Sequence, residues 1–497
     1  MSRESFGFAT SKEEIAQRLR HSGFSGVTLA LGEKRPVWVR NEPGPQTREV
    51  RVMSIVPDVS TNKRTAKCVA YLAVAAGLLG LPSVAAAQWN NHGDGDETFS
   101  VVTTVETPTK STLNGFDISY VDPYVGEYFL SDSTDKAILA INLFTKAPTL
   151  LGTTAGFTGA PTTCGVPHAC NGPDGNFTVH DWNGTEIWAG NGNSDVVVLS
   201  YPSGSLVKDI STATPGLATT YYRADEGCWD PEDHLALVAN DSAVPNPYIS
   251  FIRTDNYSIV KQIVFDGGSG TSTVSGISIG HGPNATNGIE QCNWNEREHA
   301  FYLNLPEVNG SGNDTADGNV VVINPHSLQI VQTFDIPVAE CAGPQGMATG
   351  PAPQILLGCN AKGPPSNTGP QNAAIINEEN GNIIKVLDNQ GGNDEVWFNP
   401  GDGHYSLAEG SHATNVYLGI VDSQPISVDQ QIAIAPTPPG SGPHSVAQDP
   451  ILNEIYLPIE ASVEAGATAK ICPTAGVGCV AIFKSNRREQ HFVYRGH

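Results

Sequence analysis

One turn-and-strand unit recurs along this sequence and restricts its fold more than any other feature. It is clearest at residues 442–450, where a Gly-Pro pair leads into a short strand and an Asp-Pro turn, followed by an alternating strand at 454–457. The same order of features returns every 49 to 65 residues, seven times in all. Periods of this length are typical of repeat architectures, in which each unit buries its apolar face only against its neighbours.

Six of the seven repeats contain four short strand-like stretches, such as 127–132 in the first repeat and 383–387 in the fifth. The seventh has only three before the chain ends, while a lone strand signal at 99–105 precedes the first repeat. Pairing that strand with the last repeat would close a ring and leave no long edge exposed. We therefore expect an all-β, seven-bladed β-propeller in which the N-terminal strand closes the last blade, in preference to two stacked β domains.

The repeat unit resembles that of the YVTN-type, lactonase-like β-propellers, which runs Gly-Pro, a few small or apolar residues, Asp-Pro, and then an Ile-Tyr-Val-like strand. The match is closest at residues 442–457 and 343–359 and loosest in the fourth repeat, where Asn295 stands at the turn. It extends over nearly all of 97–485. The resemblance implies the fold but no single activity, because relatives of this architecture include lactonases, quinone-dependent dehydrogenases, lyases and binding scaffolds.

Residues 63–87 have the three parts of a secretory signal. Three basic residues within 63–67 precede an apolar run at 68–81, and small residues follow up to Ala87. The apolar run is too short to span a bilayer comfortably. We therefore expect a periplasmic or secreted protein that is cleaved after Ala87 and has no membrane association afterwards.

The domain boundaries follow from this signal. Residues 1–87 would be an N-terminal extension plus signal peptide, with translation starting at Met53; a long or dual targeting peptide is the alternative. Residues 88–485 would form the propeller, and 486–497 a tail. The role of the stretch before Met53 and the oligomeric state stay open.

Eight of the nine cysteines lie beyond the signal, an even number in an oxidising compartment. Two pairs bracket small loops, and a third pair lies on strands expected to be neighbours. The remaining two cysteines occupy similar positions in consecutive repeats. The expected disulfides are Cys164–Cys170, Cys472–Cys479, Cys341–Cys359 and, by elimination, Cys228–Cys292.

The formal net charge of −24 argues against nucleic-acid partners, because a phosphate backbone would be repelled. It leaves cations, neutral glycans and small organic molecules as ligands. The expected partner is therefore a small molecule or a glycan.

One position of the repeat is polar in all seven units. Aligning the units on their turns places it at the start of each innermost strand, which in a propeller surrounds one mouth of the central channel. Five of the seven residues are carboxylic acids, whose ionised forms repel one another unless a cation or raised pKa values relieve the repulsion. The seven ring residues are Asp117, Asp174, Asp225, Glu290, Gln345, Asp394 and His444.

Two interpretations of this ring stay open. In the first, the acids only cap neighbouring strands by accepting hydrogen bonds from backbone N–H groups. Alternatively the ring binds a divalent cation, Ca²⁺ first because the ligands are oxygens, with Mn²⁺ or Zn²⁺ admitted by His444. Glu226 and Glu395 directly follow ring acids and could add carboxylates. The expected ligands are Asp117, Asp174, Asp225, Glu290, Asp394 and His444.

No catalytic motif identifies a reaction. The sequence has no Walker loop, dinucleotide fingerprint or His-Glu-x-x-His. We expect a metal-dependent hydrolase of lactone or ester type acting on a small molecule or sugar, with His444 and Asp394 as catalytic residues. The alternatives are a non-catalytic scaffold that binds a glycan or a protein, and a lyase acting on an acidic sugar.

Overall fold

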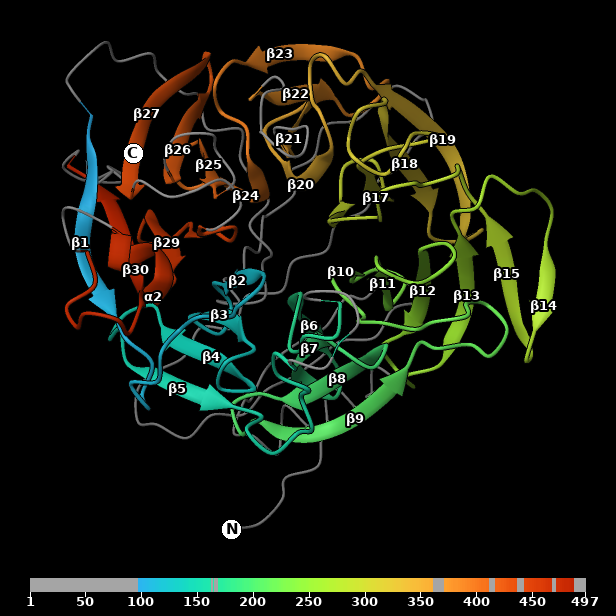
Figure 1. Cartoon of the computed structure of the whole chain (residues 1–497), viewed down its shortest axis with the longest axis horizontal. Helices are drawn as coiled ribbons and strands as arrows, with labels where there is room; N and C mark the ends of the chain where they lie inside the picture. The colour runs from blue at the N-terminus through green and yellow to red at the C-terminus, as the bar shows by residue number, and fades with distance from the viewer. Residues whose placement is uncertain are drawn as a thin grey trace, which may run out of the picture. The chain divides into compact units, whose positions relative to one another are not determined.

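Seven antiparallel sheets surround a central axis and form a seven-bladed β-propeller (Figure 1). The computed structural model describes residues 97–161, 164, 169–360, 371–410, 416–435, 442–466 and 471–486. The expected signal and the expected cleavage after Ala87 lie outside the described residues, as does the tail from 487 onward. Among the described residues, no helix has the length and apolar content needed to cross a membrane.

The strands of blades 1 to 6 follow in chain order from the centre of the ring outward (Figure 1). Blade 1 comprises β2 (Ser119–Asp122), β3 (Glu127–Asp132), β4 (Ala137–Asn142) and β5 (Pro148–Leu151). Blade 2 comprises β6 (Asn176–Asp181), β7 (Gly184–Asn191), β8 (Asp195–Ser200) and β9 (Ser205–Ser211). Blade 3 contains β10 (Gly227–Asp230), β11 (Leu235–Asn240), β12 (Tyr248–Arg253) and β13 (Ile259–Val264).

The remaining blades repeat this pattern. Blade 4 comprises β16 (Cys292–Asn295), β17 (Ala300–Leu305), β18 (Gly318–Asn324) and β19 (Gln329–Ile336). Blade 5 comprises β20 (Pro344–Thr349), β21 (Gln354–Cys359), β22 (Ala373–Asn377) and β23 (Ile383–Leu387). Blade 6 comprises β24 (Asn393–Asn399), β25 (His404–Glu409), β26 (Val416–Ser423) and β27 (Ile426–Ala435). Blade 7 combines β28 (Ala447–Asp449), β29 (Glu454–Ile459) and β30 (Cys479–Ser485) with β1 (Phe99–Val105).

The N-terminal strand closes the ring, as the repeat count predicts. β1 lies antiparallel to β30, with Phe99 opposite Ser485 and Val105 opposite Val480. Figure 1 shows the two strands, from opposite ends of the chain, side by side. The pairing continues to Asn486, whose N–H donates to the Thr98 carbonyl at 2.9 Å, so the closing blade extends one residue past the expected boundary at 485.

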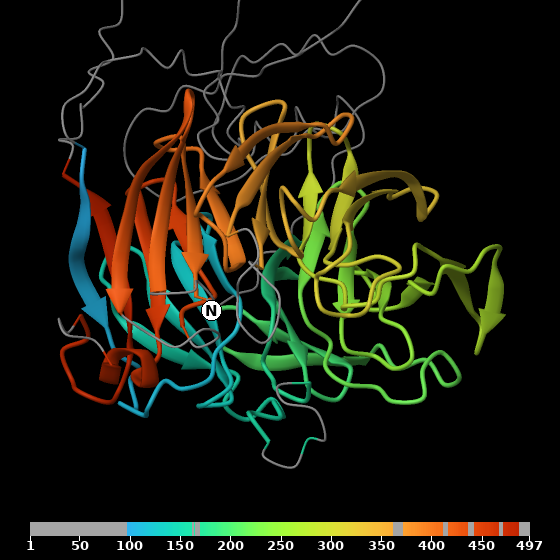
Figure 2. The ribbon, with the colours of Figure 1, turned by 45° about the horizontal axis from the view of Figure 1, so that its top comes forward.

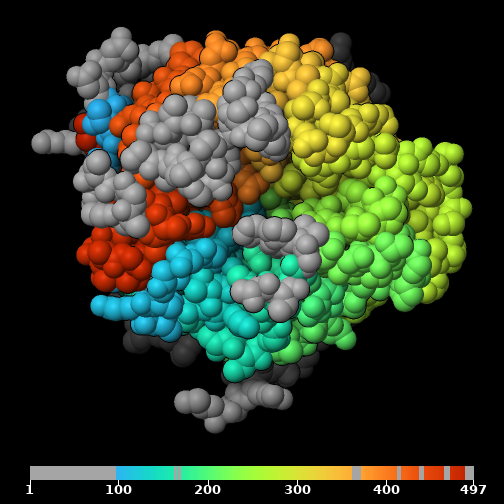
Figure 3. Space-filling view, in the orientation of Figure 1, coloured from blue at the N-terminus to red at the C-terminus, as the bar shows by residue number. Residues whose placement is uncertain are grey.

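The apolar core lies between the blades. The second and third strands of a blade are buried on both faces and have continuous apolar runs, as in β8, whereas outer strands such as β9 are mostly exposed. Seven apolar clusters each join residues of two neighbouring blades. The blades therefore stand face against face around the ring, as the tilted ribbon and the space-filling view show (Figures 2 and 3).

Polar turn residues end the innermost strands as the Asp-Pro pattern predicts. Oδ1 of Asp122, Asp230 and Asp449 each accepts a hydrogen bond from the N–H two residues later, at 2.8–2.9 Å. Asn295 makes the same bond to Arg297 at 3.0 Å. The fourth repeat therefore keeps the turn geometry although its sequence match is the loosest.

Two features were not expected. Blade 3 carries an additional hairpin, β14 (Ser272–Val274) and β15 (Ile277–His281), with β15 parallel to β13, which gives a six-stranded sheet (Figure 1). A small apolar cluster that includes Tyr248 and Ile279 lies beneath this hairpin. A short helix, α2 (Ala461–Gly466), follows β29.

The four disulfides are those expected from the sequence. Cys164–Cys170 and Cys472–Cys479 close small loops, and Cys341–Cys359 joins the segment before β20 to the end of β21. Cys228–Cys292 joins β10 to β16 and thereby cross-links blades 3 and 4. Four disulfides fit an oxidising compartment.

Candidate functional site at the channel mouth

The ring residues of the first four blades occupy the same backbone position. In each, the N–H of the ring residue donates to a carbonyl in or next to the blade's second strand, at 2.8–3.0 Å. Asp174 and Glu290, whose repeats have turns of different length, make this bond to Gly190 and Asn304. The register inferred from the turns is therefore confirmed for these blades.

The acidic side chains converge. In three groups of three residues, atoms that could bind a metal ion lie within 4.8 Å of one another. Because the groups share Asp117 and Asp394, they form one continuous set, which we call the acidic arc. Gln345 Nε2 lies 3.5 Å from Glu290 Oε1. The three groups are Asp117–Asp394–His444, Asp117–Asp174–Asp225 and Glu226–Glu290–Asp394.

A guanidinium that the sequence analysis missed lies against the arc. Arg223 Nη2 is 2.7 Å from Asp225 Oδ2 and 3.4 Å from Asp241 Oδ2. Its Nη1 is 3.6 Å from Asp117 Oδ2 and 3.7 Å from Asp174 Oδ1. Arg223 thus supplies one positive charge that four carboxylates share, which reduces the repulsion on this side of the arc.

The sequence does contain a signal for Arg223. The residue two positions before each ring residue is glycine in six repeats and arginine only in the third. At Gly288 and Gly343 the backbone φ is positive, which favours glycine there. A long cationic side chain at one such position is therefore a departure from the repeat. The six glycines are Gly115, Gly172, Gly288, Gly343, Gly392 and Gly442.

The other side of the arc has no lysine or arginine in direct contact among the described residues, although the charges of His444 and Arg223 act on it from nearby. Glu226 is buried, and its Oε2 has no hydrogen-bond partner among the described residues. Glu290 and Asp394 are half-buried beside it. Within the described part of the chain, no lysine or arginine forms an ion pair with these three carboxylates. We call Glu226, Glu290 and Asp394 the open sector of the arc.

Burial and crowding hold protons on the arc. Burial raises the pKa of four of its acids well above their ordinary values, and neighbouring carboxylates add to the shift. Burial likewise raises the pKa of Asp394 to about 6, although the charge of His444 opposes it. The four strongly shifted acids are Asp174, Asp225, Glu226 and Glu290.

His444 lies at one end of the arc and is placed as a hydrogen-bond donor. Its ring stacks on Phe116, and its Nε2 is 3.1 Å from the Phe116 carbonyl oxygen and 3.6 Å from Asp117 Oδ1. Nδ1 is 3.4 Å from the Gly442 carbonyl oxygen. Burial acts to lower the pKa of His444, but Asp117 and Asp394 raise it overall. These contacts suit an imidazolium, whereas metal ligation requires a lone pair on one nitrogen.

Glu395 does not join the arc, although it follows a ring acid as Glu226 does. Its Oε2 accepts hydrogen bonds from Ser445 Oγ at 2.5 Å, Val446 N at 3.0 Å and Ser119 N at 3.2 Å. Burial raises the pKa of Glu395 well above its ordinary value. Because its partners belong to blades 7 and 1, Glu395 ties three blades together.

A Gly-x-Ser-x-Gly pattern occurs at residues 276–280. It lies in and next to β15, the parallel strand of the additional hairpin, and not at a turn from a strand into a helix. The structure therefore does not give Ser278 the setting of a nucleophile elbow.

Comparisons with known proteins identify no family. No family model and no curated protein sequence matches this chain. Among solved structures, a chain described as "Crystal Structure of Mitotic Checkpoint Complex" aligns with a TM-score of 0.48 and 10% identity, over 79% of this chain and 98% of that one. The assignment of the fold rests on the seven sheets described above.

Proposed function

We propose that this protein is an exported propeller of the YVTN type that binds a divalent cation in the open sector and hydrolyses a lactone or ester bond of a small molecule or sugar. One observation carries the proposal: three carboxylates meet there, one of them buried with an unpartnered oxygen, and no lysine or arginine of the described residues forms an ion pair with them. Four disulfides support export, because such bonds persist in oxidising compartments.

The residues present fit a hard divalent ion. Glu226, Glu290 and Asp394 offer only oxygens, and Gln345 lies close enough to Glu290 to add an amide oxygen after rotation of its side chain. Such a set favours Ca²⁺, with Mn²⁺ as the next candidate. The set suits Zn²⁺ less well, because the nitrogens of His444, the imidazole of the arc, point at carbonyl oxygens.

Asp394 and His444 are the residues proposed to handle protons. A divalent cation, when bound, would polarise a carbonyl and lower the pKa of a coordinated water. The pKa of Asp394 is about 6 in the ion-free protein, and Asp394 would serve as the base near neutral pH when Glu226 and Glu290 hold the ion. His444, held as an imidazolium by Asp117, can donate one to a leaving oxygen.

The charge of the arc favours hydrolysis of a neutral substrate over the lyase alternative. The arc and Asp241 together have seven acidic groups and two cationic side chains. Even with protons held on the four strongly shifted acids, the three remaining carboxylates outnumber the cations, so a sugar acid would approach against net negative charge. A neutral lactone or ester carries no such cost. A glycan- or protein-binding scaffold without catalysis remains the second candidate, supported by the pocket described in the next section.

The test is elemental analysis of the purified protein, followed by a lactone and ester panel assayed with and without chelator. The wild type should retain about one divalent ion per chain, and turnover should fall at least about tenfold after chelation. Glu226→Gln and Glu290→Gln should lose the ion. Glu379→Gln, which changes an exposed turn carboxylate, is the matched control.

Each result decides between the candidates. Retention of an ion without turnover on the panel would reject the hydrolase and favour the binding scaffold. Absence of any bound ion, with unchanged behaviour of Glu226→Gln, would reject the cation site and leave the acids as strand caps.

A further inference from the structure

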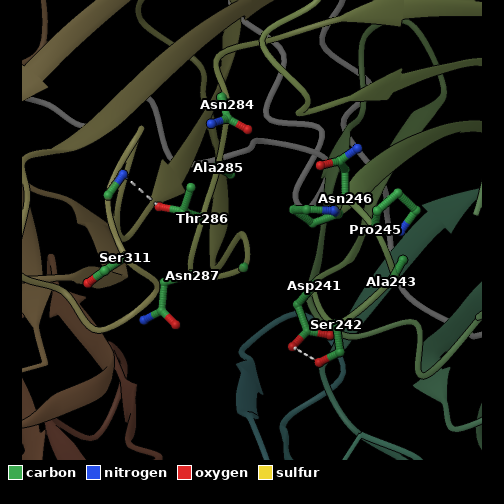
Figure 4. A pocket seen from close by; sticks show the side chains of 13 residues that line it. Asp241, Ser242, Ala243, Pro245, Asn246, Asn284, Ala285, Thr286, Asn287 and Ser311 are labelled. Carbon is green, nitrogen blue, oxygen red and sulfur yellow. Dashed lines mark hydrogen bonds between the residues drawn. The ribbon is translucent and has the colours of Figure 1, made fainter. Parts of the chain in front are cut away.

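A polar pocket of about 450 Å³ opens beside the acidic arc (Figure 4). Its walls are the loop between β11 and β12, the loop leading into β16 and the loop between β17 and β18. The volume lies within the roughly 300–1,000 Å³ that small-molecule sites occupy. Figure 4 shows the carboxylate of Asp241 and amide and hydroxyl side chains around it, from Ser242, Asn246, Asn284, Asn287 and Ser311.

The pocket borders the arc at two points. Asp241 lines the pocket and is also one of the carboxylates that contact Arg223. Gly288 lines it as well, and a Cβ there would lie 3.6 Å from the Asp241 carbonyl oxygen and 3.9 Å from Glu290 Oε1. A ligand in the pocket would therefore lie next to Glu290 of the open sector.

The walls are held by hydrogen bonds that do not depend on a ligand. Val244 pairs with Thr220, and Ala285 pairs with Val308, as isolated β-bridges. The buried Glu307 carboxylate accepts hydrogen bonds from Thr286 Oγ1 at 2.9 Å and from Thr315 N at 2.9 Å, and so joins two of the walls. Because the walls are already ordered, the pocket should lose little conformational entropy when a ligand binds.

The chemistry of the lining selects a ligand class. Among the residues lining the pocket, Asp241 alone is charged, and Arg223 offsets its charge. No described residue hydrogen-bonds the amide of Asn246, while Asn284 and Asn287 each use one amide hydrogen on a neighbour. An apolar ligand would leave these groups unpaired, which is costly. Vicinal hydroxyls can pair with amides, and the side chains of Ala243 and Pro245 offer apolar contact to C–H groups.

We propose that this pocket is a binding subsite for a neutral, polyhydroxylated ligand, one or two sugar units in size, held beside the open sector. The inference deepens the proposed function, because it names where a substrate of the arc would be held and of what class it is. Binding in the pocket itself needs no metal ion. Uronic acids, which carry a carboxylate, should bind more weakly than the corresponding neutral sugars because of the acidic arc.

The test is a titration of the full-length mature protein with methyl glycosides of glucose, galactose and mannose and with the matching uronic acids, followed by ligand-observed NMR. At least one neutral glycoside should bind in the presence of EDTA. Asn246→Ala should weaken that binding about tenfold, since a lost pair of hydrogen bonds has about that effect. Asn193→Ala, at an exposed asparagine in a blade 2 loop, should leave it unchanged.

The proposal would be overturned if no neutral glycoside binds the wild type, if binding survives in the Asn246→Ala/Asn284→Ala double variant, or if uronic acids bind as tightly as neutral sugars. Binding that is abolished by EDTA would also overturn it, because the ligand would then depend on an ion and not on the pocket. Failure of the cation site in the open sector, in contrast, would leave EDTA-independent binding intact, so the two proposals fail separately.

Discussion

At the scale of single residues, Arg223 determines how charge is distributed over the acidic arc. Six repeats have glycine at this position, and replacing it by arginine in one blade places a cation among Asp117, Asp174, Asp225 and Asp241. One half of the arc therefore has part of its charge offset by a side chain. A bound cation should add the most stability in the other half, where Glu226 lies.

Arg223→Met should lower the free energy of unfolding by about 3 kcal/mol at neutral pH, because it leaves buried carboxylates without their counter-charge. Urea unfolding measures the loss. Arg253→Met is the control: Arg253 pairs with Asp255 at 3.3 Å where both are partly exposed, and its removal should change stability by less than about 1 kcal/mol. Equal effects of the two substitutions would show that the arc is already neutral through bound protons.

His404 is a single residue that should make the stability of the protein depend on pH. It is buried at the start of β25, with Nδ1 3.3 Å from Asp402 Oδ1 and Nε2 3.1 Å from Asp422 Oδ1. Burial alone would lower the pKa of His404, but the two carboxylates raise it to about 10. Since this value exceeds that of an unfolded histidine, the stabilisation is complete below about pH 6.5 and is lost as pH rises toward about 10.

His404→Gln should therefore remove a pH-dependent contribution on the order of 2 kcal/mol, discounted for solvent at the partly exposed Asp422. The measurement is chemical unfolding of variant and wild type at several pH values between these limits. The difference between them should shrink as pH rises. His326→Gln, at an exposed histidine paired with Asp233, should show no such trend; a constant difference for His404→Gln would refute the ion pair.

At the scale of the elements, each blade is held to its neighbours by apolar faces, and blades 3 and 4 are also held by a covalent bond. Cys228 of β10 and Cys292 of β16 are 64 residues apart in the chain, whereas Cys472 and Cys479 are 7 apart. Closing a longer loop restricts the unfolded chain more. The inter-blade disulfide should therefore be the more stabilising of the two.

In the chain-entropy model, Cys228→Ala/Cys292→Ala should cost about 4 kcal/mol and Cys472→Ala/Cys479→Ala about 2 kcal/mol. Denaturant unfolding of the two double variants under non-reducing conditions compares them, and the second variant serves as the control for loss of a disulfide as such. A larger loss in the Cys472/Cys479 variant would mean that local loop packing outweighs the constraint between blades.

At the scale of the whole molecule, ring closure brings seven distant segments to one mouth and concentrates their charge. The arc acids with raised pKa values bind more protons in the folded than in the unfolded protein. The contribution of the arc to stability should therefore be greatest below the ordinary carboxyl pKa and should fall as pH rises through about 6, the pKa of Asp394. A cation that replaces those protons should offset this loss of stability at higher pH.

The melting temperature of the chelated protein should thus be lower at about pH 8 than at about pH 5. Millimolar Ca²⁺ or Mn²⁺ should raise the melting temperature at the higher pH by roughly 1 °C or more, and by less at the lower pH. Glu290→Gln should raise the stability of the chelated protein and weaken the response to the ion, whereas Glu379→Gln should do neither. Superimposable curves with and without the ion at both pH values would contradict cation binding.

The sequence by itself determined the number of blades, the closing strand β1, the disulfides and, in the first four blades, the register of the ring residues. These follow from local periodicity and from the rule that successive strands pair with one another, so they need no knowledge of distant contacts. Only the tertiary structure decided that Arg223 occupies one half of the arc, that Glu226 joins it while Glu395 does not, and that a polar pocket adjoins it. Those outcomes depend on side chains from different blades and loops meeting at distances of a few ångströms, which are set by how the blades pack into a closed ring.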